Sequence, residues 1–122
     1  MANPNIVNVA AIYGNTSSTS LSTTSATSLV SNAASSGKIY KINSIVVANV
    51  DGTSAADITI NVYSAAALGG TAFPIASTIS VPADATLIVT DKTTAFYLLE
   101  NQSIGATAGS ASDLVVTASW EE

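Results

Sequence analysis

The chain has 122 residues, a length that suits a single domain. Charged residues make up 9% of it, the net charge is −5, and neither cysteine nor histidine occurs. This composition excludes a disulfide framework, a cysteine nucleophile, a thiolate metal site and a serine–histidine–aspartate triad. The negative charge and the scarcity of basic residues argue against nucleic acid and anionic membranes as partners.

The first predicted element is a strand over Asn5–Tyr13, in which Ile6, Val7, Val9 and Ile12 are the large apolar residues. We expect residues 1–13 to form an extended arm or strand that reaches a neighbouring molecule, because an unpaired strand near a terminus can add to another sheet. The opening residues lack a positive segment followed by an apolar one, so we expect no secretory signal.

A tract rich in serine and threonine follows, over Thr16–Ser28, after a turn signal at Gly14-Asn15. Leucines within and after the tract indicate an irregular pair of strands, over Leu21–Thr24 and Ser28–Ser31.

The middle of the chain carries the strongest strand patterns. Lys38–Val50 predicts a long strand with a bulge or bend near Asn43-Ser44. Asp57–Tyr63 alternates with period two, which places its isoleucines on one face and Tyr63 on the polar, exposed face. Asp51-Gly52 between them is the best hairpin signal, with a loop longer than two residues.

Weaker patterns complete the prediction. Ser64–Leu68 reads as a loop with a short helical turn, and Gly69-Gly70 as a turn. In Asp113–Trp120, Leu114, Val116, Ala118 and Trp120 share one face, which favours a core or interface position for Trp120. The remaining strands are expected over Ser77–Val81, Thr86–Thr90, Ala95–Leu99 and Ser103–Ala108.

Short strands at intervals of about 8–12 residues, separated by turn signals, indicate a sandwich or barrel. We therefore predict an all-β protein, a jelly-roll-like antiparallel β-sandwich of about eight short strands, with residues 1–122 in one domain.

No pattern indicates catalysis, so we expect neither an enzyme nor a cofactor. Most acidic residues fall in turns or at strand edges, where we expect them to cap turns and solvate loops. Asp51 and Asp57 could offer oxygen ligands to calcium, but their spacing does not match an EF-hand, and a plain turn is favoured. An exposed Tyr63 would be weak support for a carbohydrate-binding module.

Four segments carry more information than their composition: Val81–Val89, Asp91–Thr93, Tyr97–Ala108 and Ser112–Glu122. Together they resemble the closing half of small β-rich virion structural proteins of tailed phages, marine and cyanobacterial phages among them. The opening Met-Ala-Asn-Pro and the strand Ser36–Ile42 are also similar, so the resemblance covers about two thirds of the chain. No catalytic residue comes with it.

The resemblance implies a non-enzymatic virion protein, foremost a decoration or cement protein of the capsid. A tail, neck or fibre subunit is the first alternative, a carbohydrate-binding surface module the second, and an exported matrix or pilus-like subunit the weakest. The implied partners are further copies of the chain, with a trimer as one option, and other virion proteins such as the major capsid protein. The residues predicted for interfaces are Ile6, Val7, Val9, Ile12, Tyr63 and Trp120.

Overall fold

The structure is a computed structural model that describes residues 11–122, and these residues form nine strands and one short 3-10 helix. The all-β prediction is therefore confirmed. The elements are β1 (Gly14–Ser20), β2 (Thr27–Asn32), β3 (Tyr40–Asn49), β4 (Ala56–Ala65), β5 (Gly69–Val81), β6 (Thr86–Thr90), η1 (Lys92–Thr94), β7 (Phe96–Leu98), β8 (Gln102–Ala108) and β9 (Leu114–Glu121).

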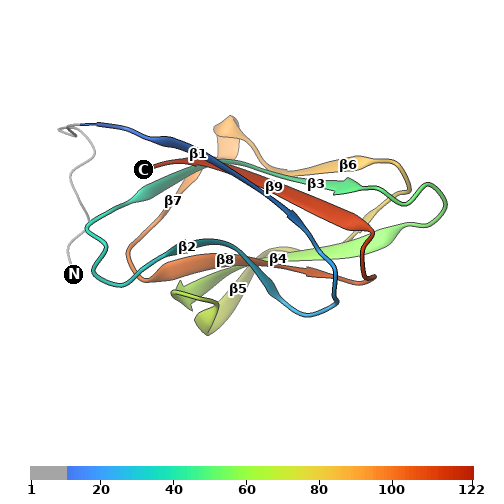
Figure 1. Cartoon of the computed structure of the whole chain (residues 1–122), viewed down its shortest axis with the longest axis horizontal. Helices are drawn as coiled ribbons and strands as arrows, with labels where there is room; N and C mark the ends of the chain where they lie inside the picture. Colours follow the sequence, from blue (N-terminus) through green and yellow to red (C-terminus); the bar gives the residue numbers. More distant parts are fainter. Residues whose placement is uncertain (1–10) are drawn as a thin grey trace.

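The strands form two antiparallel sheets that pack face to face (Figure 1). Sheet A has the order β1-β9-β3-β6, with β7 also paired to β3, and sheet B has the order β2-β8-β4-β5. The early strands pair with the late ones in reverse order: β1 with β9, β2 with β8, β3 with β6 and β7, and β4 with β5. This is a long antiparallel ribbon wound around one core, which is the winding of a jelly roll.

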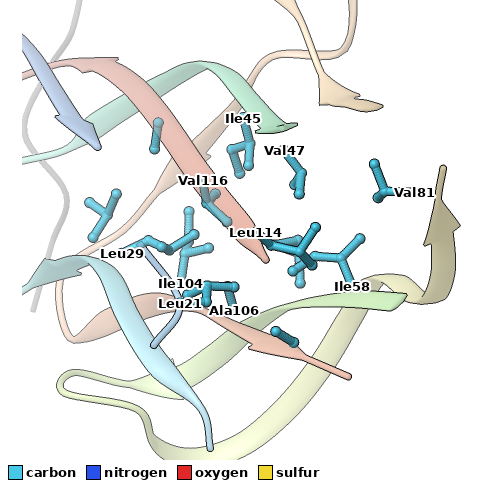
Figure 2. Close-up of a cluster of buried hydrophobic side chains, with 14 of the residues drawn as sticks. Leu21, Leu29, Ile45, Val47, Ile58, Val81, Ile104, Ala106, Leu114 and Val116 are labelled. Carbon is cyan, nitrogen blue, oxygen red and sulfur yellow. The ribbon is translucent and has the colours of Figure 1, made fainter. Parts of the chain in front are cut away.

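The core lies between the sheets and is built by alternation along the strands (Figure 2). Ile58 and Ile60 of β4 are fully buried, whereas Asp57 is exposed and Thr59 half-buried. On β9, Leu114, Val116 and Ala118 are buried in the same way, and the residues between them are half-buried. Apolar side chains on one face of each strand thus meet across the sandwich, and their removal from water is the main stabilising term.

Several predicted boundaries agree with the structure. Thr86–Thr90 is β6, and the expected bend in the long strand is the register shift of β3 against β9 between Ile42 and Ser44. The predicted strands over Ser28–Ser31, Ala95–Leu99 and Ser103–Ala108 correspond to β2, β7 and β8 within a residue or two.

Four local predictions are wrong. One is the short helical turn over Ser64–Leu68, where the structure has the end of β4 followed by a turn with positive φ at Ala67 and Leu68. The first strand of the tract is β1 at Gly14–Ser20, so Gly14-Asn15 begins a strand, and Leu21–Thr24 follows it without strand structure. Asp51-Gly52 connects β3 in sheet A to β4 in sheet B, so it bridges the sheets and closes no hairpin. Gly69-Gly70 opens β5, which starts eight residues before the predicted Ser77. Pairing with distant strands decided these positions, and local turn propensity did not.

Candidate interaction surfaces

The outer face of sheet A, the face turned away from the core, is uncharged over its central rows. Strand register places Val46 of β3 between Ile88 of β6 and Thr117 of β9, and Thr117 next to Ser18 of β1. The hydroxyls of Ser18 and Thr117 lie 3.0 Å apart, which confirms that they share this face. We call it the outer A face, and its central residues are Thr16, Ser18, Ser20, Ser44, Val46, Ala48, Thr86, Ile88, Val115, Thr117 and Ser119.

Many charged residues lie at the two ends of the sandwich, whereas Asp91 and Lys92 lie at η1, between β6 and β7. One end has four aspartates in or beside its loops. Three of them, Asp51, Asp84 and Asp113, are brought together by backbone hydrogen bonds between the loops. The Asp84 amide donates to the Asp51 carbonyl (3.1 Å), and the Val50 amide donates to the Asp113 carbonyl (2.8 Å). The fourth is Asp57, at the start of β4. At the opposite end, the Lys38 ammonium forms a salt bridge with the Glu122 carboxylate at 2.9 Å. The broad outer A face between the two ends is therefore left neutral.

Charged groups near the loops have structural partners. The Glu122 carboxylate beside Lys38 raises the pKa of that ammonium. Hydrogen bonds from the hydroxyl and amide of Thr93 lower the pKa of Asp91, which caps η1, and the amide and hydroxyl of Thr53 do the same for Asp51. These carboxylates organise turns, as the sequence predicted for acidic residues.

Of the predicted interface residues near the N-terminus, Ile12 is within the described part of the chain and is 63% exposed. Tyr13 beside it is 65% exposed, although its backbone pairs with Glu122 in both directions at 2.9 Å. Ile6, Val7 and Val9 lie outside the described residues. The segment that enters β1 thus leaves large apolar side chains uncovered at residues 12 and 13.

The expectation that Tyr63 is exposed is wrong, since only 9% of it is accessible. Tyr63 does point to the outer side of sheet B, but the hairpin tip between β4 and β5 folds over that side. A Cβ atom on Gly105 of β8 would lie 3.0 Å from the Tyr63 ring and 2.7 Å from Leu68 of the tip. The Tyr63 ring therefore packs against the backbone of Gly105, beneath the tip of its own hairpin. A buried tyrosine is not a platform for a sugar, so the support that Tyr63 gave to a carbohydrate-binding module is removed.

Trp120 packs against the core and is half-buried, in agreement with its position on the apolar face of the last strand. Its ring stacks on Tyr40 with the centroids 6.1 Å apart and the planes inclined by 25°. The pair closes the sandwich at the end that carries Lys38 and Glu122.

Sequence reasoning missed an exposed apolar strand. Phe73, Ile75 and Ile79 of β5 are 57%, 44% and 41% exposed, and we call them the β5 strip. Among the described residues no strand pairs with the outer edge of β5, which ends sheet B. A signal was present, because proline within an apolar run, here Pro74, is typical of an edge strand.

The described residues offer little else as a site. A half-open cavity of about 380 Å³ is lined by Ala34, Ser35, Ser64, Leu99, Glu100, Asn101 and Gln102. Within residues 11–122, no three acidic side chains converge as metal ligands, and no helix is long and apolar enough to cross a membrane. Comparison with models of known protein families gave no match, and neither did comparison with curated proteins.

Proposed function

We propose that the chain is a structural subunit of a tailed-phage particle, a decoration or cement protein that packs on the capsid surface. The observation that carries the proposal is the neutral outer A face. Interfaces between proteins are depleted in charge at their centre, and a broad sheet face of valine, alanine, serine and threonine can pack closely against another protein without burying unpaired ions.

Two further arguments support the virion role. The resemblance of the closing segments to small phage virion proteins falls on β6, η1, β7, β8 and β9, which supply much of the fold. Jelly rolls also recur in viral capsid and lectin domains. A fold does not imply a function, so the alternative of a carbohydrate-binding module needs a sugar-binding site of its own. The burial of Tyr63 removes the residue that supported such a site.

The first test is quantitative mass spectrometry of gradient-purified particles from a culture that produces the chain, with immunogold labelling of the same particles. We expect the chain in many copies per particle, with the label over the head. Label confined to the tail would contradict decoration and favour the tail alternative, and particles without the chain would overturn the virion role.

A second test addresses the outer A face directly. Particles that lack the chain are incubated with recombinant protein, and the bound fraction is measured by co-sedimentation. Val46→Lys places a charge at the centre of the face on a half-buried side chain, and we expect at least tenfold weaker binding. Ala111→Lys, on an exposed turn between β8 and β9, is the matched control and should bind like the parent. Equal binding of both variants would show that another surface contacts the particle.

A further inference from the structure

We infer that the β5 strip is a docking site for the N-terminal segment, residues 5–12, of a second copy of this chain. The inference concerns self-association and stands independently of the virion role. Phe73 and Ile79 lie opposite Val62 and Ile58 in the register of β4 and β5, so their side chains are on the core-facing side of sheet B. They are nevertheless about half exposed, because sheet A leaves this part of β5 uncovered.

The course of β5 explains the exposure. Its register against β4 shifts three times, and Thr78 has a φ of 51°, a left-handed conformation unusual for a β-branched residue. Bulges of this kind bend a strand. In Figure 1 the hairpin end of β4 and β5 lies below β2 and β8, away from sheet A. The bend therefore turns apolar side chains of the core side out to solvent.

The β5 strip is an apolar surface on an edge strand that has no charged side chain to protect it. All 13 residues of β5 are uncharged, whereas exposed edge strands are usually protected by charge as well as by proline and bulges. Pro74 has no amide hydrogen, and the Thr71 and Thr78 amides donate to side chains of β4, at 2.8 Å to Ser64 and 3.0 Å to Thr59. Backbone pairing to a partner is limited by these features, so side-chain burial must supply most of the affinity.

The N-terminal segment matches this acceptor. Residues 5–12 read Asn-Ile-Val-Asn-Val-Ala-Ala-Ile and contain no charge. The structure describes residues 11 and 12 of this segment. Of these, Ile12 is large and apolar, and it is 63% exposed. An uncharged segment rich in β-branched residues and an exposed apolar strand are complementary in chemistry. Strand addition is a general mode of peptide recognition.

Geometry favours a second copy as the donor. β1 ends sheet A at one side, and β5 ends sheet B at the other. Three strand spacings and one sheet separation put these edges roughly 17 Å apart. At ~3.3 Å per residue, a segment folding back on its own β5 would spend about five residues on the crossing. Donor and acceptor lie on opposite edges of one copy, so copies can associate either by reciprocal exchange in a dimer or head to tail, and a head-to-tail contact forms a ring such as a trimer when the rotation between copies closes.

Light scattering of the purified chain over a range of concentrations tests the inference. We expect an oligomer for the full chain and for the control Val50→Lys, which changes an exposed apolar side chain just after β3, outside both the outer A face and the β5 strip. We expect monomers for a chain lacking residues 2–10 and for Ile79→Lys. A full chain that stays monomeric, or an oligomer that survives the deletion, would overturn the inference. The virion role is untouched by either result, because no particle is present.

A binding measurement guards against loss of folding in the lysine variant. A fluorescent peptide of residues 2–13 is titrated with the deleted chain, and anisotropy reports binding. Phe73→Ser in the deleted chain, near the exposed hairpin end, should weaken binding at least tenfold without lowering the melting temperature appreciably. Equal affinity for the Phe73→Ser chain, or for a scrambled peptide, would contradict docking on the β5 strip.

Discussion

At the residue scale, two buried asparagines tie the loops to the sandwich. Asn49, at the end of β3, is 3% exposed. Its amide group donates to the carbonyls of Ser54 (3.0 Å) and Val81 (2.9 Å), and its side-chain oxygen accepts from the Asp51 amide (2.9 Å). Asn32 has a similar role at the end of β2, where it donates to the Lys38 and Leu98 carbonyls. Each asparagine satisfies backbone groups that a change of sheet would otherwise leave unpaired.

Asn49→Ala is expected to lower the free energy of unfolding by about 2–4 kcal/mol, because it removes three hydrogen bonds and leaves buried backbone groups without partners. Urea denaturation followed by fluorescence measures the change. The control is Asn15→Ala, whose half-buried side chain makes a long, solvent-exposed bond of 3.4 Å to the Tyr13 carbonyl, and it should stay within ~0.5 kcal/mol of the parent. A loss below ~1 kcal/mol for Asn49→Ala would mean that water replaces the asparagine.

At the scale of elements, the β4–β5 hairpin is held in a strained turn. Ala67 and Leu68 both have positive φ, 55° and 60°, the conformation of a type I′ turn that usually selects asparagine and glycine. Three consecutive amides, of residues 66, 67 and 68, donate to side-chain oxygens of Asn101, Ser31 and Ser103. These bonds from other strands offset the strain and hold the tip over Gly105.

Gly105→Ala is expected to destabilise the fold by about 1–3 kcal/mol, since the new methyl group would overlap Leu68 and press on Tyr63. Adding Leu68→Ala should recover part of the loss by removing the overlap. The control is Gly14→Ala, where a Cβ atom meets nothing within 4 Å. Thermal melts of the four proteins check the expectation, and a Gly105→Ala chain as stable as the parent would show that the tip moves aside at no cost.

At the scale of the whole molecule, most pairings join residues far apart in the chain. β9 pairs with β1, about a hundred residues earlier, and with β3, while β8 pairs with β2. Long loops must close before such contacts form, so a fold of this kind has a high contact order. The jelly roll thus makes its stability depend on the two halves of the chain meeting.

We therefore expect refolding of the monomeric chain lacking residues 2–10 in about milliseconds to seconds, and not in microseconds. Trp120 is the single tryptophan and packs against the core beside Tyr40, so its fluorescence reports the closure of β9 on β3. Stopped-flow dilution from urea measures the rate. A transition complete within the dead time would contradict the dominance of long-range pairing.

By itself, the sequence determined the all-β class, most strand positions and the buried faces of β4 and β9, because alternation with period two is a local signal. It also predicted the core side of Trp120. Only the tertiary structure decided which strands pair, that Asp51-Gly52 joins two sheets, and that Gly14 begins a strand. The tertiary structure also decided that Tyr63 is buried and that part of β5 is exposed. Burial of a residue on the outer face of a sheet depends on what a distant segment does, and here a folded hairpin covers Tyr63 while a bend uncovers Phe73 and Ile79.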